Sequence, residues 1–360
     1  MITQIRTADF ADRSVTARLL QLLAGLMAFV AAAEMAARLD DWYKYGASPL
    51  APYNREGLEG ADEYGVRGKP YARFEKWRLD NLGFRGPDVG PKQAGRPRIV
   101  VMGSSETFGL YEQEERDWPS QLRGLLKARG VDAELINAAF YGFGLQLNLT
   151  QLERRILPLH PDVIVLYLDP YSGHYLTGIE AARSRLQTRP AFELRLGRKA
   201  WSALQSLIPR PCYAAYLRAL VARERRRYRL QVYDRVPPEV DGRIRADLQR
   251  FVDLTRQHGA RLILTSHVCR TDELALLMRQ RDRAALTTGA IIDAHQRVNA
   301  LLAEVAAANQ VPFVDLAAAI PAAPELVVDA SHFSNEGSRL VAEQLVPAVI
   351  RELTAVSPDS

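Results

Sequence analysis

The stretch RIVVMGSSETFG, residues 98–109, decides the fold, because it joins a buried strand to a tight polar turn. Its first part, Arg98–Met102, is almost entirely apolar, which is typical of a parallel strand covered on both faces. Gly103 then permits a sharp turn. Ser104 and Ser105 follow where a helix begins. The stretch therefore predicts a strand followed by a turn that presents a serine hydroxyl.

The rest of the chain continues this alternation of strands and helices. Four more strands are expected, at Glu134–Ile136, Asp162–Leu168, Arg261–Thr265 and Pro312–Leu316. Helical periodicity predicts helices over Asp117–Arg129, Leu145–Ile156, Gly242–His258, Ile292–Ala308 and Glu336–Leu353. We therefore predict an α/β fold with a doubly wound, mostly parallel five-stranded sheet. Ligands of such sheets bind beyond the carboxyl ends of the strands, so reactive residues are expected there.

Composition narrows the class of protein. With 360 residues, 48% hydrophobic and 25% charged, the chain is globular and fits one large domain with additions, or two domains. Two cysteines, Cys212 and Cys269, exclude a disulfide-rich scaffold and leave a single disulfide open. The six histidines lack paired metal-ligand spacing, and the turn lacks a nucleotide-binding glycine pattern. No metal and no cofactor are expected.

The segment Leu19–Ala37 is apolar except for Gln21 and Glu34, and it is just long enough to cross a bilayer. Three arginines precede it, which puts the N-terminus in the cytoplasm and the rest outside, in the periplasm. Two other interpretations stay open. The alanines at 31–33 resemble a signal-peptide cleavage site, and the segment also suits an amphipathic helix packed on the domain.

The expected organisation is a cytoplasmic tail over 1–18, a membrane anchor over 19–37, a linker and collar over 38–97 and an α/β domain over 98–356. A helical insertion at about 172–240 interrupts this domain. Between Arg183 and Arg229 it carries 13 basic and two acidic residues, although the whole chain has a net charge of only +5. This insertion is suited to binding anionic lipid or an anionic polymer. The alternative is a solvated helical face that binds neither. No nucleic-acid-binding motif is present, so no nucleic acid is expected.

A second polar block, DASHFSNEG over residues 329–337, precedes the last helix. Serine needs a base within hydrogen-bond reach to act as a nucleophile. His332 is suited to this role, and a carboxylate must then hold its ring. Asp329, three residues earlier, can reach Nδ1 while Nε2 faces the serine. Ser334 or Asn335 is expected to cap the following helix.

Together, GSSETFG and DASHFSNEG resemble the two end blocks of the SGNH (GDSL-like) hydrolases. The resemblance implies a flavodoxin-like sheet, with Ser105 as nucleophile, His332 as base and Asp329 as the orienting carboxylate. The turn Asn137–Gly142 is similar to the second block, which implies that Gly142 lends its amide to an oxyanion hole, as does Ser105. Upstream, Asn81–Gly86 resembles a lead-in found in membrane-tethered bacterial members.

Two positions depart from the family pattern. Ser104 replaces the aspartate that precedes the nucleophile. More seriously, Asp169-Pro170-Tyr171-Ser172 stands where the third block supplies an asparagine to the oxyanion hole. Loss of one such donor costs roughly 10²–10³ in rate. Tyr171 is the substitute donor that we consider, and Asp169 and His267 are candidates to contact substrate.

The sequence thus predicts a membrane-anchored, extracytoplasmic serine esterase or O-acyltransferase. Family resemblance implies an acylated carbohydrate as substrate, an O-acetylated polysaccharide above all. Two alternatives remain: a non-catalytic carbohydrate-binding or assembly protein on the same fold, favoured by the missing asparagine, and a lipid esterase. The oligomeric state is not indicated.

Overall fold

The computed structural model describes residues 5–169 and 194–356. The chain consists of two compact units. The smaller comprises Met1–Arg55 and Pro190–Ile208, and the larger comprises Glu56–Arg189 and Pro209–Ser360. This division differs from the expected boundaries. Residues 56–97 belong to the larger unit, and part of the basic insertion groups with the N-terminal helix.

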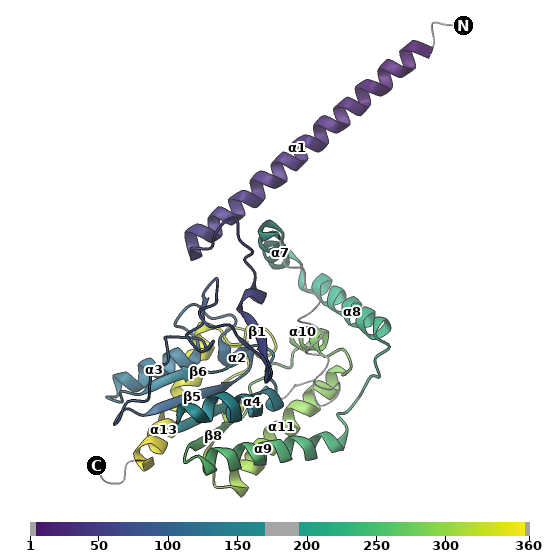
Figure 1. The fold of residues 1–360 in the computed structure, drawn as a ribbon. Helices are drawn as coiled ribbons and strands as arrows, with labels where there is room; N and C mark the ends of the chain where they lie inside the picture. Colours follow the sequence, from purple (N-terminus) through teal and green to yellow (C-terminus); the bar gives the residue numbers. More distant parts are fainter. Residues whose placement is uncertain (1–4, 170–193, 357–360) are drawn as a thin grey trace. The chain divides into compact units, whose positions relative to one another are not determined.

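A five-stranded sheet forms the centre of the larger unit (Figure 1). Its order is β6-β5-β7-β8-β9, and every neighbouring pair is parallel. The strands are β5 (Arg98–Gly103), β6 (Glu134–Asn137), β7 (Val163–Tyr167), β8 (Arg261–Thr265) and β9 (Phe313–Val314). The predicted α/β class and parallel five-stranded sheet are confirmed. The strand order reverses at β5, so the carboxyl end of this strand is the topological switch point where ligands bind.

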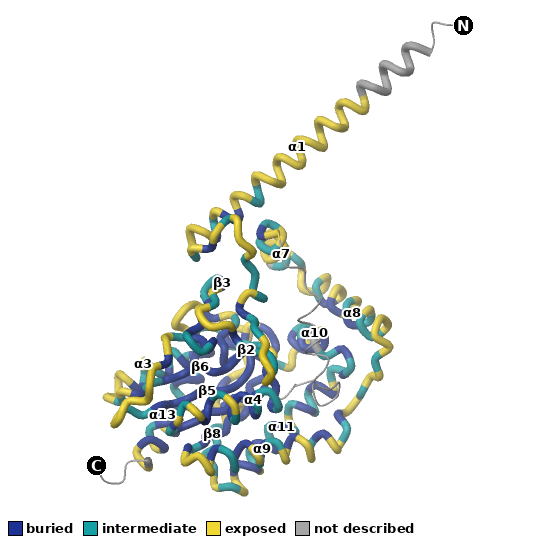
Figure 2. Tube along the Cα trace, viewed as in Figure 1, coloured by how far each residue is buried: buried dark blue, intermediate teal, exposed yellow. Residues whose placement is uncertain are grey.

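Helices cover both faces of this sheet because successive residues of a strand point to opposite sides. From β5, Ile99 and Val101 pack with α3 (Trp118–Ala128) and α13 (Asn335–Val356). Val100 and Met102 pack on the other side with α4 (Leu145–Gln151), α9 (Pro238–Gln257) and α11 (Thr288–Ala308). Figure 2 shows the strands buried between these layers.

Several elements escaped the sequence prediction. The helix expected over 145–156 continues from α4 as a π-helical turn, η2 (Leu152–Ile156), followed by η3 (Leu157–Leu159). The larger unit also contains α2 (Ser105–Phe108), which begins at the predicted turn, and α8 (Arg210–Arg227), which lies in the predicted helical insertion. The helices α10 (Glu273–Asp282) and α12 (Leu316–Ala319) were not predicted. Cys212 is exposed and Cys269 is buried, and no disulfide joins them.

The collar ahead of the sheet contains η1 (Arg55–Leu58) and two antiparallel pairs, β1 (Glu59–Asp62) with β2 (Gly65–Gly68) and β3 (Arg73–Phe74) with β4 (Trp77–Arg78). Arg85, within the lead-in block, fastens the collar to the start of the sheet domain. Its guanidinium donates to the carbonyls of Phe108 and Gly109 and forms a 3.2 Å ion pair with Asp117. The collar therefore supports the turn that follows β5.

In the smaller unit, one helix, α1 (Ile5–Tyr45), contains the predicted membrane segment. Val15–Tyr45 has a mean hydropathy of 1.8 in its most apolar window, none of which is buried. The exposed residues of this stretch are the yellow part of α1 in Figure 2. A second helix, α7 (Arg195–Leu207), packs against the C-terminal part of α1.

Candidate active site

The nucleophile candidate, Ser105, is the first residue of α2, directly after β5. Gly103 makes the turn possible because a Cβ there would lie 2.5 Å from the carbonyl oxygen of Tyr167 and 2.3 Å from Thr107 Oγ1. The backbone of the turn therefore packs directly against the neighbouring strand β7. This close approach leaves the hydroxyl of Ser105 at the carboxyl edge of the sheet.

Asp329 and His332 lie in the loop before α13, which forms a tight local structure. A bridge between Val327 and Phe333 closes the loop, and Asp329 Oδ1 accepts the amides of Ser331 and His332, both at 3.0 Å. Ser334 Oγ accepts the amide of Gly337 at 3.1 Å, so Ser334 caps α13 as expected. The loop thus fixes the carboxylate and the imidazole relative to each other before any contact with the serine.

These two segments meet in a continuous relay. His332 Nδ1 lies 2.8 Å from Asp329 Oδ2, and His332 Nε2 lies 2.8 Å from Ser105 Oγ. A carboxylate only accepts hydrogen bonds, so Nδ1 carries the proton and Nε2 is left to accept from the serine. The three predicted residues are therefore brought together in the geometry that a nucleophilic serine requires.

The charges in this relay favour a protonated imidazole during reaction. Burial alone would lower the pKa of His332, but the hydrogen bond to Asp329 and the charges of Glu106 and Asp329 raise it above its ordinary value of 6.5. Burial likewise opposes ionisation of Asp329, yet its hydrogen bonds to His332 and Ser331 hold its pKa well below the usual range. Asp329 is thus a permanent anion that stabilises the imidazolium.

A second carboxylate, Glu106, lies beneath the relay and is fully buried. Its Oε1 accepts from Ser331 Oγ at 2.6 Å, and its Oε2 is 3.3 Å from Ser105 Oγ. His267 Nε2 approaches to 3.6 Å and Arg279 Nη1 to 3.8 Å. Burial would raise the pKa of Glu106, but the nearby His267, His332 and Arg279 lower it well below its ordinary value.

The third-block position is occupied by an ion pair. Asp169 is 6% exposed, and its Oδ1 lies 2.7 Å from Arg279 Nη2, while Arg283 approaches to 3.5 Å. The carboxylate is therefore engaged within the protein, and its contact with substrate stays a prediction. Tyr171, the proposed substitute donor, lies outside the described residues. His267 is fully buried against Glu106 instead of lining an open surface.

The second block lies beside the nucleophile turn. Asn137 Nδ2 donates to the carbonyl of Thr107 at 2.9 Å, and the ring of Phe108 packs edge-on against Phe140 and Tyr141. Gly142 has a φ of 83°, and a Cβ there would meet no atom within 4 Å. The turn therefore needs glycine for its backbone conformation, with open space in front of it. Donation by the Gly142 amide to an oxyanion stays a prediction.

Ligand atoms of Glu106, Asp169 and His267 lie within 4.8 Å of one another, which suits a cation. Arg279 already supplies the positive charge there, through its contacts with Asp169 and Glu106. The cluster is therefore a charge-compensated network of buried side chains.

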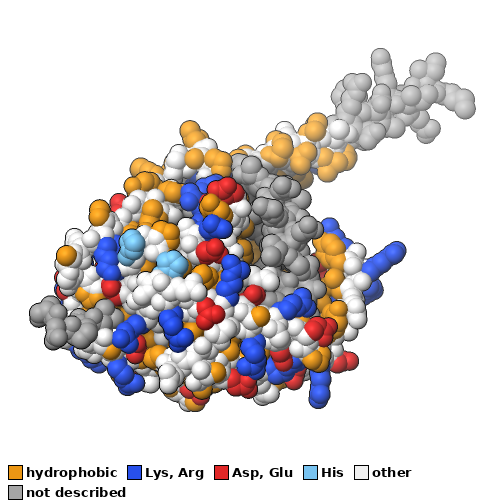
Figure 3. All heavy atoms as spheres, turned by 60° about the horizontal axis from the view of Figure 1, so that its bottom comes forward, with side chains coloured by type: hydrophobic (Ala, Val, Ile, Leu, Met, Phe, Trp, Pro, Cys, Tyr) orange, Lys and Arg blue, Asp and Glu red, His pale blue; other side chains and the backbone are white. Residues whose placement is uncertain are grey.

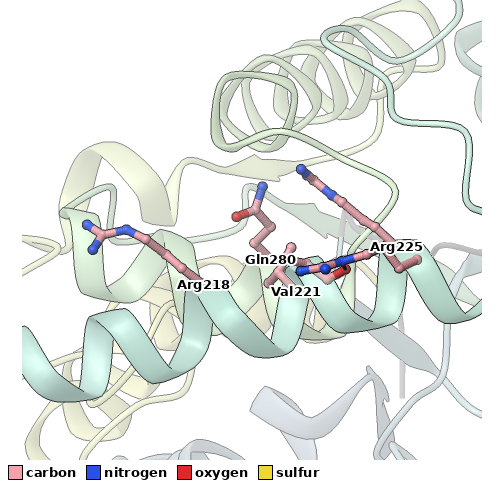
Figure 4. Close-up of a pocket in the computed structure, with 6 residues that line it drawn as sticks. Arg218, Val221, Arg225 and Gln280 are labelled. Atoms are coloured by element: carbon pink, nitrogen blue, oxygen red, sulfur yellow. Dashed lines mark hydrogen bonds between the residues drawn. The ribbon is translucent and has the colours of Figure 1, made fainter.

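Outside this site, a pocket of about 380 Å³ lies between α8 and α10 (Figure 4). It is lined by Arg218, Val221, Ala222, Arg225, Arg226 and Gln280. Two of its cations are partly used within the protein, since Arg218 pairs with Glu273 and Arg225 donates to the carbonyls of Ala284 and Leu286. On the face of the molecule seen in Figure 3, Lys and Arg side chains are interspersed with acidic side chains.

Sequence reasoning missed Glu106, Arg279 and Ser331. For Glu106 the sequence held one signal, which is its position directly after the candidate nucleophile, in a turn between apolar segments. A charged side chain that is buried there needs a partner. No comparable signal pointed to Arg279, since α10 was not predicted.

Similarity to known proteins was found among solved structures. No protein-family model matches the sequence, and no curated protein matches it. Solved structures do match. A GDSL-like lipase from Bacteroides thetaiotaomicron is 15% identical with a TM-score of 0.44, covering 73% of this chain and 92% of its own. The acetyl xylan esterase AlAXEase is 14% identical with a TM-score of 0.42, covering 70% of this chain and 99% of its own.

A third match is the esterase EstA from a Pseudoalteromonas species. It is 11% identical with a TM-score of 0.43, covering 71% of this chain and 98% of its own. These similar structures are a GDSL-like lipase and two esterases, whereas the α/β class of this chain rests on its own parallel five-stranded sheet. At these identities the likeness describes the fold alone, so the chemistry of this chain is argued from its own residues.

Proposed function

We propose that the protein is a serine esterase or O-acyltransferase in which Ser105 is the nucleophile, His332 the base and Asp329 the orienting carboxylate. One observation carries this proposal: the relay of 2.8 Å contacts from Asp329 through His332 to Ser105. A serine with this pair of partners is activated for attack on an acyl carbon.

The reaction has two halves. The Ser105 hydroxyl attacks the ester carbonyl while its proton passes to His332 Nε2, and the leaving alcohol then takes that proton. The result is an acyl-Ser105 intermediate. Water or a sugar hydroxyl attacks it with His332 again as base, which restores the serine. The amides of Ser105 and Gly142 are the proposed donors to the oxyanion.

Labelling with a fluorophosphonate probe tests the nucleophile. The full chain in detergent is expected to label, whereas Ser105→Ala and His332→Ala are expected not to. Ser104→Ala is the matched control, because it removes the adjacent hydroxyl and should keep labelling. A folded parent chain that does not label would overturn the proposal.

The proposed substrate is an acylated carbohydrate, with an O-acetylated polysaccharide as the first choice. Short acyl esters and acetylated oligosaccharides should be cleaved faster than long-chain lipid esters, and the reverse order would indicate a lipid esterase. Mass spectrometry of the sugar products, after incubation with an acyl donor, separates transfer from hydrolysis.

A non-catalytic role is the second candidate, and one observation favours it. The Asp169–Arg279 ion pair stands where the third block supplies an oxyanion donor. Binding of an acetylated oligosaccharide by a chain that neither labels nor cleaves esters would support this role.

We further propose that α1 anchors the protein in a membrane, with its N-terminus in the cytoplasm. The apolar, exposed stretch of α1 and the arginines before it support this arrangement. A cleaved signal sequence is the alternative. N-terminal sequencing of the protein from both the membrane and the soluble fraction distinguishes them, because cleavage near Ala33 would remove the apolar stretch and release the chain.

A further inference from the structure

The basic side of α7 is neutralised within the smaller unit. Arg198 Nη2 lies 2.9 Å from Asp41 Oδ2, and Lys199 Nζ lies 2.7 Å from Asp41 Oδ1 and also pairs with Asp40. The side chains of Arg195 and Asp41 are each only 1% exposed. The positive charges of α7 therefore face the acidic residues of α1.

The first turn of α7 is fastened to α1 by Glu34. This carboxylate accepts the backbone amides of Arg195 at 3.2 Å and Leu196 at 2.8 Å, and it pairs with Arg38 at 2.7 Å. Moving α7 away would leave buried charges without partners, which costs several kcal/mol. The orientation of α7 on α1 is thus fixed by its polar side.

The opposite side of α7 is apolar and exposed. On that side the exposed fractions are 43% for Trp201, 50% for Leu204 and 77% for Leu207, and Leu194, directly before the helix, is 48% exposed. A helix of a globular protein usually directs its apolar side inward and its charges outward. In α7 this arrangement is reversed, which is typical of a helix whose apolar side contacts lipid.

The position of α7 along α1 indicates which surface covers it. At ~1.5 Å per residue, the apolar segment from Leu19 to Ala33 extends about 22 Å, so it spans most of the ~30 Å of a bilayer's hydrocarbon core. Glu34, where α7 is fastened, then lies at the boundary of that core. Trp42 and Tyr43 follow at 56% and 87% exposure, as in an interfacial aromatic belt. Figure 1 shows α7 beside the C-terminal end of α1.

The geometry points to α7 as an interfacial helix that lies in the head-group region of the bilayer spanned by α1, with Leu194, Trp201, Leu204 and Leu207 inserted among the acyl chains. This inference rests on the anchoring role proposed above for α1. Its partner is the lipid surface itself. Because the cations of α7 are paired with Asp40 and Asp41, insertion depends on apolar burial and not on anionic lipid.

Depth-dependent quenching of a fluorophore tests this inference. The full chain carrying Cys212→Ser and Leu204→Cys is labelled with an environment-sensitive NBD dye and reconstituted into phosphatidylcholine vesicles containing nitroxide lipids. Phe29→Cys, on the 70% exposed Phe29 of α1, reports the anchor. Lys127→Cys, on an exposed position of α3, is the matched control in the larger unit.

We expect blue-shifted, quenched emission at position 204, unchanged when phosphatidylglycerol is added, and water-like emission at position 127. Water-like emission at 204 with quenching at 29 would overturn the inference and leave the anchor intact. Blue-shifted but unquenched emission would mean that protein covers the face, as in a second copy. Quenching at position 204 that occurs only with phosphatidylglycerol would also overturn the inference. So would an absence of quenching at position 29, because α1 would then not span the bilayer.

Fluorophosphonate labelling of the same vesicles keeps the two proposals apart. Labelled protein with water-like emission at 204 would reject the interfacial helix and retain the serine esterase. Quenched emission without labelling would do the opposite.

Discussion

His332 Nε2 lies 2.8 Å from Ser105 Oγ, although 227 positions separate the two residues along the chain. The contact exists because the switch point at β5 and the loop before α13 meet at the same edge of the sheet. Each residue is oriented by its own segment, Ser105 by the Gly103 turn and His332 by Asp329. The following predictions test what this arrangement does.

Replacing Asp329 with asparagine should slow acylation without unfolding the loop. The asparagine side chain keeps the size of the carboxylate but loses the charge that holds the imidazole tautomer. In well-studied serine proteases this change costs about 10⁴ in kcat. The rate of fluorophosphonate labelling of Asp329→Asn should fall to a similar extent, and a rate within tenfold of the parent would remove Asp329 from the relay.

The pH dependence of labelling should reveal Glu106 as a positioning residue. Labelling needs neutral His332, so its rate rises with pH through the His332 pKa, which lies above 6.5. Glu106→Gln removes a negative charge that stabilises the imidazolium, so the midpoint of the profile should move to lower pH. The measurement is the labelling rate of the full chain at each pH.

Glu134→Gln is the control for this shift. Glu134 pairs with Arg98 at the amino end of the strands, away from His332. Its profile should coincide with that of the parent. If the pH profile of Glu106→Gln also coincides with that of the parent, Glu106 has only a structural role.

Glu112 should make the larger unit less stable as pH rises. Burial raises the pKa of this carboxyl to about 7 from its ordinary 4.5. Between these values the folded chain binds a proton that the unfolded chain has lost, so the free energy of unfolding falls as pH rises through this window. At 1.36 kcal/mol per pKa unit, the penalty above pH 7 is about 3 kcal/mol.

Glu112→Gln should remove that penalty, since glutamine stays neutral and still accepts from Ser338 Oγ. Thermal unfolding should show a gain in stability at pH 8 that shrinks toward pH 5. Glu239→Gln, at an exposed position of α9, should show no such gain. Parallel pH dependence in parent and Glu112→Gln would contradict the prediction.

The Asp169–Arg279 pair should be strongly coupled. Arg279→Met leaves two buried carboxylates, Asp169 and Glu106, without this cation, and such a loss typically costs 3–5 kcal/mol. Adding Asp169→Asn should recover part of the loss, because one of the two charges is gone. Denaturant unfolding of both single variants and the double variant measures the coupling, and simple additivity would contradict it.

Most of the fold could be predicted from the sequence because the strands are short apolar runs with clear boundaries. Arg261–Thr265 was predicted to the residue as β8, whereas β9 is only Phe313–Val314. As an edge strand, β9 pairs only with β8 and over two residue pairs. The apolar residues on either side of it were therefore predicted as strand but are not part of it. The helix α10 was missed because its arginines obscure the periodicity of its apolar residues.

The site was predictable only where the residues lie in recognisable local blocks. Ser105, Asp329 and His332 meet as expected. Glu106 and Arg279 were not found, because the burial of a carboxylate becomes understandable only with the cation that a distant helix supplies. Ionic networks of this kind depend on tertiary packing and leave little trace in local sequence.

Arg85 has a practical consequence for anyone who shortens this chain. A fragment beginning at residue 98 would encode every strand of the central sheet, together with Ser105 and His332. It would nevertheless strip the carbonyls of Phe108 and Gly109 of their donor and leave Asp117 without its ion-pair partner. A soluble version intended for crystallisation or directed evolution should therefore start upstream of Glu59, so that the collar is retained as support for the turn after β5.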